Sequence, residues 1–197
     1  MSAALPSALL RLTCRPNLTE GAYAFLYEIE NEGPAEAFVM HATKSVDPVT
    51  HTGRPNDQAA VVILASDDAA LVGKFIAPLP TDRRVAVPVI PLARRLAPGA
   101  RLQAELKIVA PLAETSPYFP DLTLRRYEIM TVHAVAFTIG YWVTGVDQLV
   151  ATPTEYAPDL FAVVTRNTLG SALGITQRFP TRGIQFFKRT DAFPRQL

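Results

Sequence analysis

The chain has 197 residues, of which 49% are hydrophobic and 19% charged, and 19 Lys and Arg against 18 Asp and Glu give a formal net charge of +1. These values are typical of one folded globular domain and exclude an intrinsically disordered chain. Nucleic-acid-binding surfaces carry a strongly basic stripe, and this sequence has no long run of one charge sign, so we expect no nucleic-acid partner.

Three features of the sequence predict a cytoplasmic protein that binds no membrane. Cys14 is the only cysteine, so an intrachain disulfide is excluded. The first ten residues lack a basic segment and are interrupted by Pro6, which argues against a secretory signal. The longest apolar stretch, residues 129–143, is shorter than the ~20 residues of a membrane-spanning helix and is rich in β-branched and aromatic side chains.

Seventeen prolines and ten glycines divide the chain into short segments, most of which alternate between apolar and polar residues. A period of two predicts β-strands with one buried face. In the first part of the chain we expect strands at residues 10–15, 23–30 and 37–42. Residues 44–58 show no periodicity and contain Pro, Asp, Asn and Gly, so we expect a long loop there that is mobile and dispensable for folding.

The middle of the chain continues this pattern. Residues 61–65 and 71–77 are expected to form a hairpin. Two prolines in residues 85–92 remove hydrogen-bond donors and predict an edge strand or a bulged one. Residues 101–108 alternate cleanly. Residues 127–143 are apolar on both faces and predict a central segment covered on both sides, either one long bent strand or a hairpin with a break near Gly140.

After Gly145 the alternation weakens, and short strands are expected at residues 160–165, 169–176 and 183–188, with a helix as the alternative around residues 158–165. The whole pattern predicts an all-β fold, a two-sheet sandwich in one domain of residues 1–197. Its core strands are expected between about residues 8 and 143. Residues 158–197 are expected to form an irregular C-terminal extension.

Two short motifs resemble small bacterial immunoglobulin-like domains, among them adhesion-type domains and intracellular proteinase-inhibitor domains. Tyr23-x-Phe25-x-Tyr27-x-Ile29-Glu30-Asn31-x-Gly33 is similar to their second strand and its turn. Leu96-x-Pro98-Gly99-x-x-Leu102 resembles the proline-glycine turn and alternating strand that precede a late strand. The resemblance covers roughly residues 8–143 and implies an immunoglobulin-like sandwich, but it assigns no functional residue.

No pattern of residues predicts catalysis or a cofactor. The sequence lacks a Gly-x-Ser-x-Gly elbow and a phosphate-binding glycine loop. His41 and His51, with Asp47 between them, are weak candidates for a transition-metal site; ordinary surface histidines are the alternative. Cys14 is expected on the apolar face of its strand as an inert buried thiol.

Two functional hypotheses follow. We favour a non-enzymatic binding or assembly protein that acts through homo-oligomerisation or a protein partner. Its candidate interface is an aromatic and arginine-containing tail, for which a core strand is the alternative: Phe179, Arg182, Phe186 and Phe187. The other hypothesis is an enzyme or small-molecule carrier with a pocket between the sheets, lined by His133, Tyr141 and Trp142.

Overall fold

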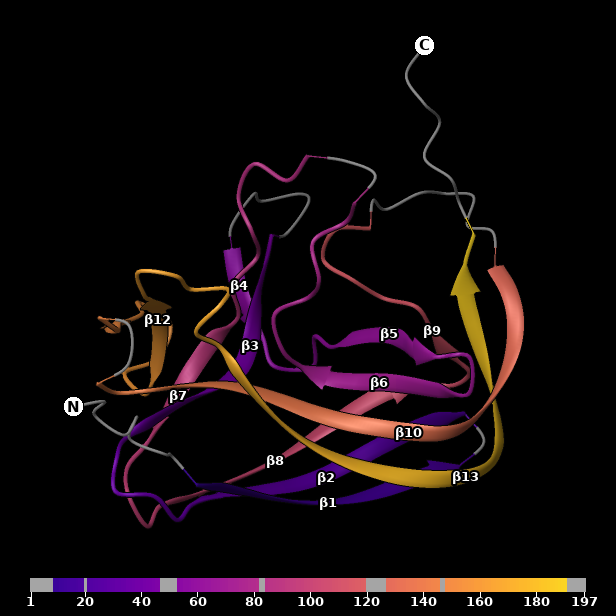
Figure 1. Ribbon diagram of the computed structural model, residues 1–197, viewed down its shortest axis with the longest axis horizontal. Helices are drawn as coiled ribbons and strands as arrows, with labels where there is room; N and C mark the ends of the chain where they lie inside the picture. Colours follow the sequence, from indigo (N-terminus) through magenta and orange to yellow (C-terminus); the bar gives the residue numbers. More distant parts are fainter. Residues whose placement is uncertain are drawn as a thin grey trace, which may run out of the picture.

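The computed structural model describes residues 9–19, 21–46, 53–81, 84–119, 127–145 and 148–190. The secondary-structure elements within these ranges are all β-strands. No helix among the described residues has the length and apolar character needed to cross a membrane. Two sheets pack face to face (Figure 1). The protein is therefore an all-β sandwich, as the alternation predicts.

The smaller sheet has the order β1-β2-β8 and consists of β1 (Leu10–Thr19), β2 (Ala22–Asn31) and β8 (Arg101–Val109). The larger sheet has the order β11-β12-β7-β3-β10-β13-β9. Its strands are β3 (Ala37–Val46), β7 (Leu92–Leu96), β9 (Leu112–Ala113), β10 (Tyr127–Val143), β11 (Val150–Pro153), β12 (Leu160–Val164) and β13 (Leu173–Arg189). Three strands branch from this path: β4 (Gly53–Asn56) pairs with β3, β6 (Ala69–Lys74) with β10, and β5 (Val61–Ser66) with β6.

The smaller sheet follows the predicted alternation closely. Tyr23, Phe25 and Tyr27 of β2 are buried, whereas Leu26 between them is 55% exposed. Across the sandwich, the ring of Phe25 stacks on Phe137 of β10 with centroids 5.1 Å apart. The main core therefore lies between the two sheets, and β2 and β10 supply its centre.

A second apolar cluster covers the opposite face of the larger sheet. It contains Phe38 and Met40 from β3, Ala93 from β7, Trp142 from β10 and Val163 from β12. Residues 134–143 of β10 are buried on both faces apart from the half-buried Ala136, which confirms the prediction of a central strand for that part. The prediction is wrong for residues 127–133, of which Val132 alone is buried.

The C-terminal part of the chain belongs to the larger sheet rather than to an irregular extension. β13 runs antiparallel to β10 from Leu173, opposite Tyr141, to Arg189, opposite Tyr127. The pairing shifts at a bulge after Val132, and both strands bend strongly (Figure 1). The sequence pattern missed the length of this strand because Pro180 and Gly183 interrupt its alternation.

Two other segments differ from expectation. Residues 84–91 form no strand, and β7 begins at Leu92, directly after Pro91, because proline has no N–H for a ladder. Residues 53–56, expected within a loop, form β4 against β3. Of the rest of that expected loop, residues 44–46 belong to β3 and residues 57 and 58 form a turn. Residues 47–52, which include His51, lie outside the described residues.

Candidate functional site

The larger sheet divides at Gly140 of β10. Along one edge of β10, residues 134–139 pair in parallel with β6, and residues 141–143 pair antiparallel with β3. A Cβ atom at Gly140 would lie 2.4 Å from Sδ of Met40 on β3 and 3.3 Å from Cα of Phe75, which follows β6. Because Gly140 has no side chain, both neighbours approach β10 at one point. Beyond it, the β3–β4 and β5–β6 hairpins diverge (Figure 1).

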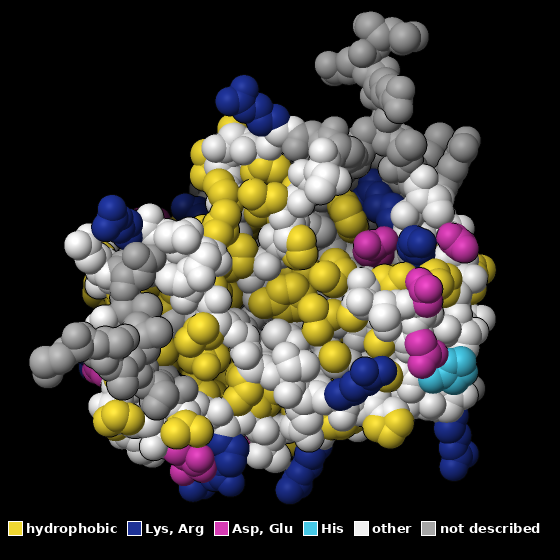
Figure 2. All heavy atoms as spheres, viewed as in Figure 1, with side chains coloured by type: hydrophobic (Ala, Val, Ile, Leu, Met, Phe, Trp, Pro, Cys, Tyr) yellow, Lys and Arg dark blue, Asp and Glu magenta, His cyan; other side chains and the backbone are white. Residues whose placement is uncertain are grey.

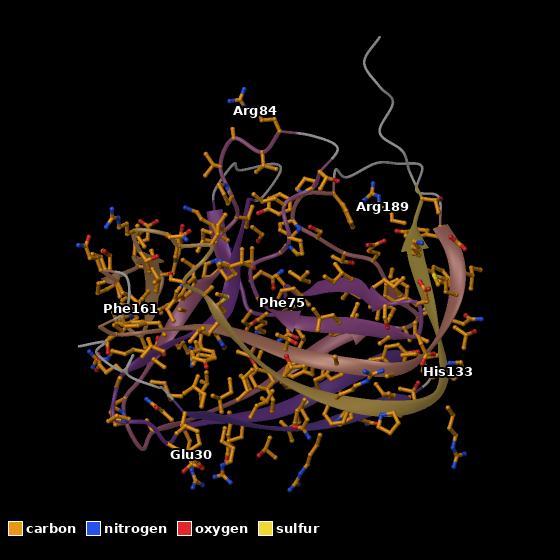
Figure 3. All side chains as sticks on the ribbon, viewed as in Figure 1. Glu30, Phe75, Arg84, His133, Phe161 and Arg189 are labelled. Carbon is orange, nitrogen blue, oxygen red and sulfur yellow. The ribbon has the colours of Figure 1, made fainter. Side chains whose placement is uncertain are left out.

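A groove of about 580 Å³ lies between these hairpins and the edge of the smaller sheet, a volume within the usual range for ligand sites. Residues 43–45 and Asn56 of the β3–β4 hairpin form one side, Val61 and Val62 of β5 another, and residues 107–109 of β8 a third. Apolar side chains make up most of the lining. Figure 2 shows them gathered in the middle of the face on which Figure 3 labels Phe75.

Gln58 connects the turn after β4 to the edge of β8. Its side-chain amide donates a hydrogen bond to the carbonyl of Glu105 (3.1 Å) and accepts one from the N–H of Lys107 (3.0 Å). A neighbouring strand would make the same two bonds with its peptide groups. The side chain of Gln58 thus occupies part of a strand edge that the smaller sheet leaves open.

Lys74, at the end of β6, holds the two hairpins in position. Its side chain is 4% exposed, and Nζ donates to the carbonyl of His41 on β3 (2.7 Å) and to the carbonyl of Asp57 in the turn after β4. The carbonyl of His41 is available because the pairing of β3 with β7 shifts at this residue. Since Phe75, Asn56 and Gln58 flank the bonded residues and line the groove, Lys74 fixes the shape of its wall.

Burial dominates the electrostatics around Lys74. It lowers the pKa of Lys74 to about 8; the charge of Asp57 opposes this shift and the charge of Arg94 adds to it. Burial, and to a lesser extent the positive charges of Lys74 and Arg94, lower the pKa of His41 to about 4. His41 is 7% exposed, and its Nδ1 has no hydrogen-bond partner among the described residues. Burial also raises the pKa of Tyr27, whose hydroxyl is likewise without a described partner.

The charges on the groove itself are positive. Its described lining contains Lys44 and Lys107 and no Asp or Glu. Nζ of Lys44 lies 5.6 Å from the ring centroid of Tyr156. Lys107 pairs with Glu105 at 2.8 Å, but both side chains are largely exposed, so water screens this pair. The groove therefore favours a ligand with an apolar body and a negative group.

The residues predicted to line a pocket between the sheets do not come together. Tyr141 packs in the main core, whereas Trp142 points to the other face of the sheet and packs with Met40. His133 lies toward the other end of β10, with its side chain 59% exposed (Figure 3). Its Nδ1 is 2.6 Å from Oδ1 of Asp68, and this hydrogen bond lowers the pKa of Asp68.

No metal site or reactive thiol emerges among the described residues. His41, one of the two weak metal candidates, is buried, and no group of three His, Cys, Asp or Glu in the described chain is arranged to hold an ion. Cys14 is 4% exposed and lies on the inner face of β1. Burial raises the pKa of this thiol to about 12, which keeps it protonated and unreactive.

The tail residues predicted for an interface occupy the sheet. Phe186 is fully buried in the main core, and Phe179 packs partly buried against it. Phe187 is partly buried, with its ring 5.7 Å from that of Tyr127. Of the four candidates, Arg182 alone is exposed.

Sequence reasoning missed Lys74 and Gln58. For Lys74 a signal was present, because it is the only charged residue in the apolar stretch 69–77. It also lies on the same face of the strand as the buried Ala70 and Val72. Gln58 carries no such signal, since its role depends on the distant strand β8. Comparison with protein-family models, with curated proteins and with solved structures finds no match for this chain.

Proposed function

We propose that this protein is a non-enzymatic binding protein that takes a segment of a protein partner into the groove between β5 and β8. One observation carries the proposal: a groove of about 580 Å³ combines apolar walls, two lysines and the open edge of a β-strand. Apolar walls match apolar side chains of a polypeptide, and a strand edge matches its backbone. The sandwich then acts as a rigid scaffold for this surface.

The order of strands supports an immunoglobulin-like form of the sandwich. In immunoglobulin domains, strands A, B and E lie in one sheet, and C, F and G in the other. Here β1, β2 and β8 occupy the positions of A, B and E, while β3, β10 and β13 occupy those of C, F and G. In this correspondence β4, β5 and β6 are an insertion after the third strand. The insertion supplies one wall of the groove, which suits that wall to a function separate from the scaffold.

The proposal places the protein in the cytoplasm, as the sequence led us to expect. The single cysteine, buried and protonated, is consistent with that reducing compartment, where structural disulfides are rare.

The experiment is a selection of random dodecapeptides, displayed on phage, against the full chain. The matched variants are Ala59→Trp, which fills the groove, and Val164→Trp, which adds the same side chain at a 61% exposed site on β12. We expect enriched peptides that bind the wild type and Val164→Trp but not Ala59→Trp. Enrichment of no peptide, or of peptides that bind all three proteins equally, would contradict the proposal.

A further inference from the structure

We infer that the partner binds as an added β-strand along the free edge of β8, displacing the side chain of Gln58, and carries an acidic residue beside Lys107. This inference rests on the proposed function and specifies its partner: an extended, largely apolar segment with Asp or Glu at one position.

The direction of the backbone groups on β8 follows from its pairing with β2. Ala110 N–H donates to the carbonyl of Gly21, and Asn31 N–H donates to the carbonyl of Ala100. In an antiparallel pair, hydrogen-bonded and non-hydrogen-bonded residues alternate. The even-numbered residues of β8 therefore bond to β2, whereas residues 103, 105, 107 and 109 direct both N–H and C=O to the free edge.

The bonds of Gln58 show that this edge binds an amide in the geometry of a strand. A side-chain amide has the same donor and acceptor as a peptide group, and this one bonds the outward groups of Glu105 and Lys107. Beyond it, the C=O of Lys107 and both backbone groups of Val109 have no hydrogen-bond partner among the described residues. The side chain of Val109 is 79% exposed. An incoming strand that displaces Gln58 gains a continuous row of partners.

The surroundings select the sequence of the added strand. Its side chains would alternate between the apolar interior of the groove, beside Ile108, and the outer face of the smaller sheet, beside Lys107. An acidic residue directly opposite Lys107 forms a favourable cross-strand pair. Glu105 repels an acidic residue at the position opposite to it, which is two residues away along the added strand. The preferred segment thus has apolar residues at alternate positions and one Asp or Glu between them.

The test uses a synthetic copy of the most enriched dodecapeptide and two matched variants at the edge. Val109→Pro removes an outward N–H and breaks no bond to β2, because residue 109 is not hydrogen-bonded to that strand. Val109→Thr keeps the N–H and a β-branched side chain. We expect Val109→Pro to weaken binding about tenfold, as the loss of one hydrogen bond does, and Val109→Thr to leave it unchanged.

Two further measurements complete the test. Gln58→Ala removes the displaced competitor and should tighten binding, and hydrogen exchange of the Val109 amide should slow in the complex. If peptides bind but Val109→Pro and Val109→Thr behave alike, the added strand is wrong and the proposed function stands. If no peptide binds, the proposed function itself fails. A dimer of the chain that Val109→Pro abolishes would identify a second copy as the occupant and overturn the inference.

Discussion

The two sides of the groove differ in structure. One side is β8, the regular edge strand of the three-stranded sheet, and the other consists of two hairpins that diverge at Gly140. In the smaller sheet, the inward apolar side chains of β2 and β8 pack in the main core, whereas outward ones such as Leu26 and Val109 are exposed. In the divided part of the larger sheet, a buried lysine bonded to two backbone carbonyls links strands that no longer pair with each other.

The difference concerns what stabilises each side of the groove. Apolar burial is nearly independent of pH and depends on the volume of each side chain. A buried ammonium group depends on its protonation and on the few hydrogen bonds that it makes. We therefore expect the small sheet to be most sensitive to truncation of a large core residue, and the divided region to be most sensitive to changes of charge.

The largest effect is expected for Phe25→Ala. Phe25 is fully buried and stacked on Phe137 across the sandwich, so its removal leaves a cavity between the sheets. The free energy of unfolding should fall by about 3–5 kcal/mol, measured by urea denaturation.

Leu26→Ala is the control for this substitution, because Leu26 is the next residue and is 55% exposed. It should change the free energy of unfolding by no more than ~0.5 kcal/mol. Equal losses for the two variants would show that the core does not depend on the alternation of β2.

The same contrast explains how far the sequence predicts the structure. The faces of β2 and β8 could be assigned because local alternation is enough to place Phe25 inside and Leu26 outside. The parallel pairing of β6 with β10 depends on contacts between residues more than sixty positions apart, for which a periodicity holds no information. β13 was underestimated for a local reason, since Pro180 and Gly183 resemble the end of a strand although the ladder to β10 continues past them.

The candidate site was less predictable than the fold. The absence of period in residues 44–58 predicted only a mobile, dispensable loop, whereas this region forms β4 and supplies Asn56 and Gln58 to the groove. The pocket expected from His133, Tyr141 and Trp142 relied on their closeness in sequence. Neighbouring residues on a strand point to opposite faces, so Tyr141 and Trp142 do not share a pocket.

A smaller effect is expected for Lys74→Met. The substitution keeps an unbranched side chain but removes both hydrogen bonds, leaving the carbonyls of His41 and Asp57 without this donor. The protein should lose about 1–3 kcal/mol of stability at pH 7. Lys44→Met, at an exposed lysine in the same groove, should leave the melting temperature unchanged.

The pH dependence of this variant has a defined sign. The pKa of Lys74 is about 8 in the folded protein, whereas the ordinary value of 10.5 applies in the unfolded chain. Between pH 8 and 10.5 the unfolded chain therefore binds more protons than the folded protein. The pH-dependent part of the contribution of Lys74 to stability is complete above pH 10.5 and is lost as the pH falls through 8, below which the hydrogen bonds to the two carbonyls are its remaining contribution. The stability of the wild type relative to Lys74→Met should therefore rise from pH 8 to pH 10. A constant difference would show that Lys74 is not buried as described. Burial also raises the pKa of Tyr27 and Cys14, but these groups are present in both proteins and cancel in the difference.

The smallest effect at neutral pH is expected for His41→Leu. The carbonyl of His41 still accepts from Lys74, and leucine removes a buried Nδ1 that has no described partner, so stability at pH 7.5 should change by less than ~1 kcal/mol. The acid range separates the two proteins. The folded pKa of His41 is about 4, below its ordinary 6.5, because of burial and the charges of Lys74 and Arg94, partly opposed by Asp57 and Asp159. Its contribution is present above pH 6.5 and is lost as the pH falls through 4. Melting temperatures from pH 7.5 to 4 should thus fall more steeply for the wild type than for His41→Leu, and parallel curves would show that His41 takes up its proton as readily in the folded protein as in the unfolded chain.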